Sequence, residues 1–375
     1  MESDSNSQEG SSEDEIHMEA ISLSTPPPTT ATVKRANETK VNNASKCFRD
    51  VFGKIKEKMV AVTKFAEEKW LKQCGFSAYS DRTRAYQIWP GNNVFFFHGR
   101  LVFGPDPRGL VLTTASIIIS SWIFTMYNDG DDGDDHLPVH STLLVTLSLL
   151  LTITALVSLF LVSSSDPGII PRNDQTTMEE ITGTSNGNRR KKITINGVEL
   201  KLKYCRICKI FRPPRSCHCA ICNNCVEKFD HHCPWIGQCV ALRNYRFYMT
   251  FLISALCLVI FIFVFSFWRI QRRMLRIGSG LLGMLMNSPE NLALTLFSFG
   301  AIWFLAGLTI FHFYLIAINQ TSYENYRQSY VESENPFDKG LLRNIKEALF
   351  SKLAPSRVDF RVEVEPSGHS NAEEV

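Results

Sequence analysis

Four long apolar runs constrain the fold of this 375-residue chain more than any other feature of its sequence. None of them contains Asp, Glu, Lys or Arg, and they cover Leu110–Tyr127, Thr142–Val162, Tyr248–Trp268 and Leu292–Ile318. A helix rises about 1.5 Å per residue, so about 20 apolar residues cross the roughly 30 Å of hydrocarbon in a bilayer. We therefore predict an α-helical membrane protein with four transmembrane helices. For the first run, which is the shortest and is rich in Ser and Thr, a buried helix of a soluble domain is the alternative.

The charged residues between these runs predict the orientation of the chain in the membrane. Lys and Arg crowd the stretch before the first run and the segment between the second and third runs, whereas the loop between the first two runs is acidic. Because basic loops favour the cytosolic side, we expect both termini and the long middle segment in the cytosol. A group of arginines directly after the third run speaks against this orientation, namely Arg269, Arg272, Arg273 and Arg276.

Composition divides the chain into six segments. Residues 1–45 are rich in Ser, Glu, Thr and Pro, which predicts a disordered tail. Residues 46–109 form a cytosolic pre-membrane region. Within it, the basic amphipathic pattern of Cys47–Trp70 predicts a helix that lies on an anionic leaflet or packs on the cytosolic domain. The other four are two transmembrane helices, a cytosolic linker with a cysteine-rich domain, two further transmembrane helices and a cytosolic C-terminal region (110–162, 163–247, 248–318 and 319–375).

Eight of the eleven cysteines fall between Cys205 and Cys239, in the segment predicted to be cytosolic. In a reducing compartment such crowding indicates metal ligation or catalysis rather than disulfides. Two cysteines separated by two residues aim both thiolates at one point, and a tetrahedral zinc site needs four such sulfur or nitrogen ligands. Together with the nearby histidines, the cysteines supply enough ligands for two closed sites and leave several residues over. Just before them, Asn196 and Gly197 between two short apolar strands predict a β-hairpin.

The residues left over include Cys217, His231 and Cys233. A cysteine acts as a nucleophile through its thiolate, which a neighbouring base favours. Asp230 stands directly before His231, where its carboxylate can orient the imidazole. The spacing alone leaves two interpretations equally open: His231 and Cys233 are a catalytic pair, or they are a spare pair of metal ligands.

The block Asp230-His231-His232-Cys233 lies in this cysteine-rich frame between the second and third predicted helices. With it, the chain resembles the DHHC protein S-acyltransferases. Other similarities to that family are a turn after the second run, a hydroxyl-rich stretch after the fourth, a C-terminal motif and an upstream motif of its plant branch (Asp166-Pro167-Gly168, Thr321-Ser322-Tyr323-Glu324, Asn335 with Phe337, and Trp89-Pro90-Gly91). The resemblance covers roughly residues 84–344 and leaves both tails outside.

The resemblance implies two structural zinc ions and the ligands of each. One ion would be held by Cys205, Cys208, His218 and Cys225, and the other by Cys219, Cys222, His232 and Cys239. It also implies that Cys233 is the acylated nucleophile, that His231 is the base and that Asp230 orients His231. Ser322 replaces the usual second Thr and keeps a hydroxyl that can bond toward the active site, while Asn335 is a further supporting residue.

The activity implied by the resemblance is transfer of a palmitoyl or other fatty acyl group from acyl-CoA through Cys233 to cysteine thiols of client proteins. Arg212 and Arg215 are candidates for binding the CoA phosphates. The expected partners are the bilayer, acyl-CoA and proteins with membrane-proximal cysteines, and we expect no binding to nucleic acid. The expected location is the Golgi, endosomal or plasma membrane. His312 in the fourth run is interpreted as a buried packing or interfacial residue.

Three other classes of protein compete with this interpretation. Nucleic-acid binding by the zinc module is the remotest, because a module between two membrane helices could reach only cytosolic RNA. A zinc-binding membrane scaffold without catalysis would explain the cysteines, but the intact Asp-His-His-Cys block speaks against it. A transporter or channel would explain the four helices. Ion paths usually carry charged residues inside the membrane, and the four apolar runs contain no Asp, Glu, Lys or Arg.

Overall fold

The computed structural model describes residues 83–127, 138–173, 190–278, 288–331 and 333–364, together with Gly283 and Met286. All of them belong to one compact unit, Glu67–Val375. The predicted disordered tail, the predicted amphipathic helix and the acidic loop after the first apolar run lie outside the described residues.

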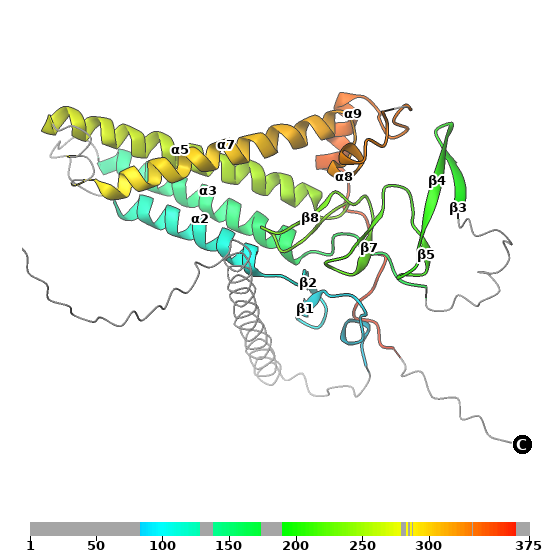
Figure 1. Ribbon diagram of the computed structural model, residues 1–375. Coiled ribbons are helices and arrows are strands. Elements are labelled where there is room, and N and C mark those ends of the chain that lie inside the picture. Colours follow the sequence, from blue (N-terminus) through cyan, green and yellow to red (C-terminus); the bar gives the residue numbers. More distant parts are fainter. Residues whose placement is uncertain are drawn as a thin grey trace, which may run out of the picture. The chain divides into compact units, whose positions relative to one another are not determined.

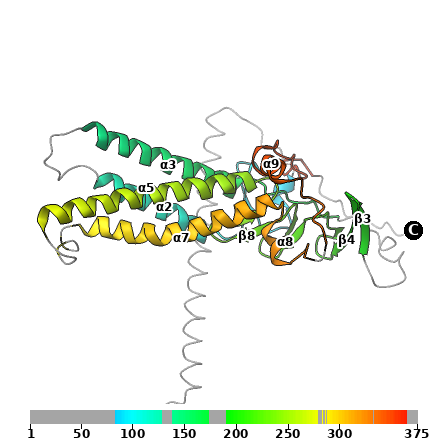
Figure 2. The ribbon, with the colours of Figure 1, turned by 90° about the horizontal axis from the view of Figure 1, so that it is seen from above.

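Four long helices run side by side in Figures 1 and 2, and each is long and apolar enough to cross a membrane. They are α2 (Arg108–Met126), α3 (Pro138–Ser164), α5 (Tyr245–Ile277) and α7 (Pro289–Ala317). The prediction of four membrane helices is therefore confirmed. Helix α5 is longer than the apolar run Tyr248–Trp268 that it contains, and it continues through the arginines that follow this run. Arg269 lies 4.8 Å from the ring centroid of Phe124, and Arg272 lies 4.9 Å from that of Trp268.

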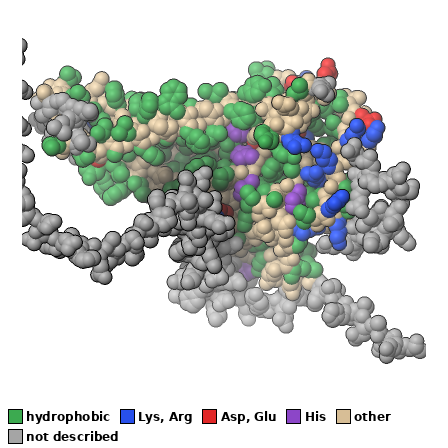
Figure 3. All heavy atoms as spheres, viewed as in Figure 1, with side chains coloured by type: hydrophobic (Ala, Val, Ile, Leu, Met, Phe, Trp, Pro, Cys, Tyr) green, Lys and Arg blue, Asp and Glu red, His purple; other side chains and the backbone are tan. Residues whose placement is uncertain are grey.

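The helices bury an apolar core between them and expose apolar side chains outward. Phe124, Leu159 and Ile262 are fully buried in this core. Large apolar side chains remain exposed on the outer surface, including Leu150, Ile153, Trp303 and Ile310. Figure 3 shows this apolar surface along the helices, whereas Lys and Arg side chains gather at one end of them. Such a surface suits helices that contact lipid on the outside and one another on the inside.

A module of short antiparallel strand pairs follows α3 and precedes α5. The first hairpin joins β3 (Arg190–Ile195) to β4 (Val198–Cys205), and β5 (Ile210–Phe211) pairs with β4. The predicted turn is confirmed: Asn196 and Gly197 both have positive φ, which a two-residue hairpin turn of this kind requires. The other pairs are β6 (Cys217–Cys219) with β7 (Asn224–Val226), and β8 (His231–Cys233) with β9 (Gln238–Val240).

The turn after α3 fastens the module to the helices. The Asp166 carboxylate accepts hydrogen bonds from the backbone N–H groups of Gly168 and Ile169, at 2.9 and 2.8 Å. Its other oxygen accepts from Arg243, at 2.6 Å, at the entrance to α5. Gly168 has φ of 113°, a conformation that favours glycine. The Asp-Pro-Gly motif thus links the end of α3 to the start of α5 through the side chain of Asp166.

The chain on either side of the helices also packs on this module. Upstream lie η1 (Ala85–Gln87) and the pair β1 (Val94–Phe96) with β2 (Leu101–Phe103); downstream lie α8 (Ser322–Tyr326), α9 (Leu341–Ile345) and η2 (Lys346–Phe350). Phe360 is buried against Trp89 and Phe95, with ring centroids 5.1 and 5.0 Å apart. The C-terminal segment thereby covers the upstream strands, although it lies outside the range of the family resemblance.

Candidate active site and metal clusters

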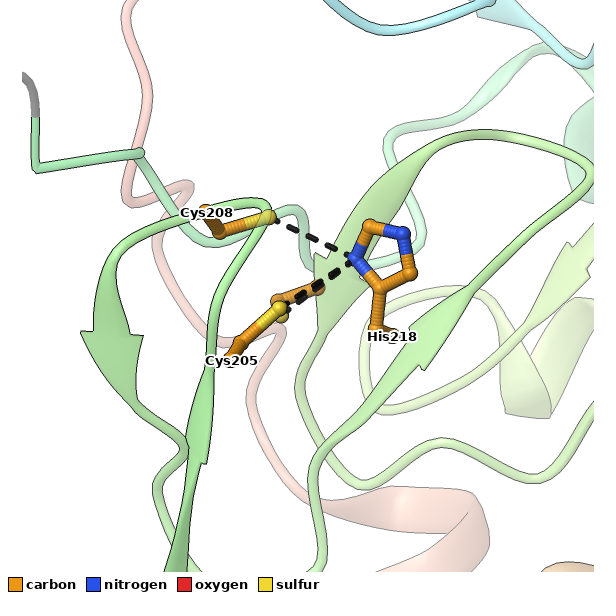
Figure 4. Close-up of side chains that lie close together, drawn as sticks. Cys205, Cys208 and His218 are labelled. Carbon is orange, nitrogen blue, oxygen red and sulfur yellow. Dashed lines mark hydrogen bonds between the residues drawn. The ribbon is translucent and has the colours of Figure 1, made fainter. Parts of the chain in front are cut away.

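The first cluster consists of Cys205, Cys208, His218 and Cys225. Its sulfurs lie 3.6, 3.4 and 3.7 Å from Nδ1 of His218, in the order Cys205, Cys208 and Cys225. Figure 4 shows the two sulfurs of the knuckle after β4 pointing at that nitrogen. The ligand set implied by the resemblance is therefore brought together at one point.

The second cluster consists of Cys219, Cys222, His232 and Cys239. The three sulfurs lie 3.7, 3.4 and 3.7 Å from Nδ1 of His232. Successive residues of a strand point to opposite faces, so β6 directs His218 to the first cluster and Cys219 to the second. This alternation explains how interleaved residues in the sequence form two separate clusters.

Both clusters fit a tetrahedral zinc ion. With bonds of about 2.3 Å to sulfur and about 2.0 Å to nitrogen, neighbouring ligand atoms of a tetrahedron lie about 3.5–3.8 Å apart. The sulfur–nitrogen distances above agree with that spacing, as does the 3.5 Å between the sulfurs of Cys222 and Cys239. Three thiolates and one imidazole are also a common zinc donor set. Each cluster can therefore hold one zinc ion.

Cys233 lies outside both clusters. On β8, His232 points into the second cluster, so its neighbours His231 and Cys233 share the opposite face. The Cys233 side chain is 7% exposed and belongs to the apolar core between the helices, together with Ile236 and Tyr248. The strand that supplies a metal ligand on one face thus presents a thiol and an imidazole to the helices on the other.

Asp230 fixes one side of the His231 imidazole. Its carboxylate lies 2.7 Å from Nδ1 of His231, and Asp230 itself is 2% exposed. Ser322 binds both oxygens of this carboxylate: its backbone N–H donates at 2.9 Å, and its hydroxyl donates to the other oxygen. The Ser that replaces the usual Thr thus makes the predicted bond toward the site.

These contacts shift both titratable groups toward their charged forms. Burial favours neutral Asp230, but the hydrogen bonds from His231 and Ser322 outweigh it and hold the pKa of Asp230 below its ordinary value. Burial likewise favours neutral His231, but Asp230 and the neighbouring Cys233 outweigh it and raise the pKa of His231 to about 9. At neutral pH the imidazole therefore carries a proton next to the thiol, which is the form that stabilises a thiolate.

Arg215 joins the module to the end of α7. Its guanidinium makes a two-pronged ion pair with Glu324, at 2.8 and 2.7 Å, and both side chains are 7% exposed. It also donates to the Asn319 side chain at 3.0 Å and lies 4.5 Å above the ring of Phe337. These contacts favour a structural role for Arg215 over the predicted contact with CoA phosphates. Arg212 lies beside Cys217, with 3.7 Å between its Nη1 and the sulfur.

The Asn335 side chain supports the same joint. Its amide donates to the backbone oxygens of Ile318 and Asn319, at 2.8 and 3.1 Å, where α7 ends. The next turn of the chain is α8, which begins with a capping box. The Thr321 hydroxyl accepts a hydrogen bond from the backbone N–H of Glu324, and the Glu324 carboxylate accepts one from the backbone N–H of Thr321. Ser322 is held at the start of this short helix, so the joint sets the position of the group that binds Asp230.

Three residues that the sequence did not assign to the site lie next to it. His312 is buried, as predicted, but it lies between Tyr245 and Tyr248, and its ring centroid is 5.8 Å from that of His231. An ionisable residue within an apolar membrane span often has a function, so the position of His312 in the fourth apolar run could have indicated its proximity to the site. Figure 3 shows histidine side chains gathered where the apolar helices meet the module.

Comparison with known proteins places this site in a family. A family model described as DHHC palmitoyltransferase matches residues 198–329, which include both clusters and β8. The chain is 44% identical over 301 residues to probable protein S-acyltransferase 2 of Arabidopsis thaliana, with 76% of this chain and 72% of that protein covered. This chain belongs to the DHHC palmitoyltransferase family.

Other members from Arabidopsis thaliana are similarly close. Probable protein S-acyltransferase 1 is 43% identical over 295 residues, which cover 75% of this chain and 86% of that protein. Probable protein S-acyltransferase 7 is 42% identical over 296 residues, which cover 75% of this chain and 66% of that protein. The predicted resemblance to the plant branch of the DHHC family is thereby confirmed.

Proposed function

We propose that this chain transfers a fatty acyl group, such as palmitoyl, from acyl-CoA through Cys233 to cysteine thiols of client proteins. Membership in the DHHC family supports an acyltransferase that acts on protein cysteines. The proposal adds the donor, the nucleophile and the roles of the neighbouring residues. The single observation that carries it is the position of Cys233: the thiol lies outside both metal clusters, beside the protonated His231 and within the core of the helices.

The first half-reaction forms the acyl-enzyme. Cys233 reacts as a thiolate paired with the protonated His231, and the thiolate attacks the carbonyl carbon of the acyl-CoA thioester. A carbon–sulfur bond forms at Cys233 while the bond to the CoA sulfur breaks, and CoA leaves as a thiol after taking the proton from His231. Asp230 holds the imidazole in place through the 2.7 Å contact at Nδ1 and stabilises its charge.

The second half-reaction reverses these roles. His231, neutral after CoA has left, takes the proton of a client thiol, and the client thiolate attacks the acyl-Cys233 thioester. The bond to Cys233 breaks, and Cys233 leaves as a thiolate that pairs again with the protonated His231. One thioester replaces another, so the exchange needs little driving force. A covalent intermediate of this kind predicts ping-pong kinetics.

The two metal clusters would act as structural supports. Zinc, when bound, cross-links strands that have little apolar core of their own. His232 would hold β8 from one side, so His231 and Cys233 would face the helices. We further propose that the module lies at the cytosolic surface, with both termini in the cytosol, because acyl-CoA needs hydrocarbon for its chain and water for its phosphates.

The test is acylation of the purified full-length chain in detergent with labelled palmitoyl-CoA, followed by hydroxylamine. We expect a hydroxylamine-labile label on the unaltered protein and none on Cys233→Ser. Cys257→Ser is the matched control, because Cys257 is an exposed cysteine on α5, remote from β8 in sequence. Equal labelling of Cys233→Ser and Cys257→Ser would refute the proposed nucleophile and leave a metal-binding scaffold as the better account.

A further inference from the structure

His312 occupies a fully partnered position inside the helical bundle. It lies on α7 and is 2% exposed. Its Nδ1 lies 3.1 Å from the hydroxyl of Tyr245, and its Nε2 lies 3.2 Å from the hydroxyl of Tyr248. A neutral imidazole can accept a hydrogen bond at one ring nitrogen and donate at the other, so two hydroxyls satisfy it completely. The histidine therefore ties the first turns of α5 to α7.

This bridge stands directly behind the catalytic pair. A ring nitrogen of His312, a ring nitrogen of His231 and a carboxylate oxygen of Asp230 all lie within 4.8 Å of one another. The ring of Tyr248 meets the His231 ring edge-on, with centroids 5.4 Å apart. It meets the ring of His312 in the same manner, at 4.9 Å. His231 is thus held by Asp230 at one nitrogen and bounded by two rings from the helices.

The same three groups could in principle hold a metal ion, but their bonds favour another arrangement. Both ring nitrogens of His312 face tyrosine hydroxyls, and both oxygens of Asp230 accept from Ser322. A metal ligand must direct a free lone pair at the ion, so binding would break several of these bonds. The polar atoms of His312 and Asp230 are therefore already hydrogen-bonded to other groups, which argues against a third metal site.

We propose that His312 is a positioning residue for acyl transfer: by holding the hydroxyls of Tyr245 and Tyr248, it fixes a wall of rings against which the His231 imidazole is oriented. The inference rests on the proposed function of Cys233 and His231 and adds a residue to it. One contact to Asp230 still leaves the imidazole free to tilt, because the His231 side chain is 29% exposed. The rings remove that freedom, so His231 stays directed at the thiol while acyl-CoA enters.

The inference predicts a defect in the chemical step and not in binding. A displacement of about 1 Å in a reacting group can cost roughly 100-fold in rate. We therefore expect His312→Phe to lower the maximal single-turnover rate of Cys233 acylation by roughly 10- to 100-fold. The palmitoyl-CoA concentration at half-maximal rate should stay unchanged, and so should the zinc content. His312→Gln should recover part of the rate, because an amide also offers one donor group and one acceptor.

A second variant removes the same bonds without changing the packing of rings. The double substitution Tyr245→Phe with Tyr248→Phe keeps both rings and deletes both hydroxyls that hold His312. We expect its maximal rate to fall nearly as far as that of His312→Phe. Tyr314→Phe is the matched control, since Tyr314 is an exposed tyrosine on the same helix as His312. It should keep the unaltered rate.

The inference is overturned if the double tyrosine variant, with its zinc intact, acylates Cys233 at the unaltered rate. It is also overturned if His312→Gln performs no better than His312→Phe and both lose rate only in proportion to lost zinc. Where His312→Phe does not fold, the double tyrosine variant alone decides. These outcomes leave the proposed nucleophile untouched, because that assignment depends on the labelling of Cys233→Ser.

Discussion

The two metal clusters have the same donor set, three thiols and one imidazole, but they are attached to different parts of the molecule. The second cluster takes His232 from the middle of β8, between His231 and Cys233. The first cluster has no ligand on β8. Its backbone instead accepts hydrogen bonds from the chain that leaves α3: Ile170 N–H donates to Cys225 at 2.9 Å, and Asn173 N–H donates to Cys208 at 3.1 Å.

Because of this difference, two clusters with the same ligands have two different structural roles. The second cluster sets the position of the strand that carries the thiol. The first cluster fastens the β3–β4–β5 sheet to the exit of a membrane helix. Loss of either would destabilise the module, because metal binding supplies folding energy in such sites. Only loss of the second removes a direct support of β8, so the two clusters should differ in their effect on acylation.

The largest expected effect comes from replacing one thiol of the second cluster, compared with replacing the equivalent thiol of the first cluster. Cys208 and Cys222 are equivalent, since each lies 3.4 Å from the histidine of its own cluster. We expect Cys222→Ser to lower acyl-enzyme formation by at least roughly 100-fold and Cys208→Ser by roughly tenfold. Each variant should lose one of the two zinc ions, as measured by elemental analysis. Equal losses of activity would remove the proposed difference between the clusters.

A joint without metal supplies the next comparison. Arg215 and Glu324 connect the module to α7 through a buried ion pair. Removing one partner leaves the other charge buried, so we expect Arg215→Met to lower the free energy of unfolding by about 3–5 kcal/mol. Thermal unfolding in detergent measures this, and both zinc ions should remain bound in the folded fraction. Arg361→Met is the control, because Arg361 is mostly exposed. An Arg215→Met variant with unaltered stability would show that this ion pair does not help to hold the module to the helices.

The Asp230→Asn variant tests whether the carboxylate beside β8 acts on the acylation step or on the structure. Asp230→Asn keeps the shape of the side chain but removes the charge that stabilises protonated His231. We expect acyl-enzyme formation to fall by roughly 100-fold with the zinc content unchanged. Asp359→Asn, at an exposed carboxylate, should have no effect on the rate. If Asp230→Asn instead lost zinc, its role would be structural and would resemble that of the second cluster.

The smallest expected effect is at Ser322. Its backbone N–H still binds Asp230 when the hydroxyl is removed, so Ser322→Ala should lower the rate by about tenfold, the lower end of what one hydrogen bond to a charged group contributes. Ser322→Thr keeps the hydroxyl and should retain the activity. Rates from single-turnover labelling compare the two. A loss as large as that of Asp230→Asn would mean that Ser322 does more than orient the carboxylate.

The sequence predicted the helices well because long apolar runs leave few alternatives in a membrane. The apolar runs did not define where the helices end: α5 continues past Trp268 through Arg269 and Arg272, whose guanidinium groups lie over aromatic rings. The sequence also contained no signal for the burial of Phe360 on Trp89 and Phe95, since contacts between distant segments leave no local pattern.

For the site, too, the sequence predicted some features and could not predict others. Cysteine spacing predicted enough ligands for two metal ions, but the assignment of each ligand came from the family resemblance, because alternate residues of β6 serve different clusters. Spacing could not separate His231 and Cys233 from the ligands either. Their face of β8 decides this, and strand direction depends on the pairing with β9. The bridge at His312 depends on three residues of two helices, whose rotations the sequence does not define.

The central claim is that one thiol carries the acyl group while eight neighbouring cysteines and histidines hold two metal ions. Native mass spectrometry of the full-length protein after brief exposure to palmitoyl-CoA, followed by peptide mapping, tests it most directly. The account predicts two zinc ions and one acyl group on the same molecule, with the acyl group on Cys233. An acyl group on any residue of the two clusters, or loss of a zinc ion as the acyl group is gained, would contradict it.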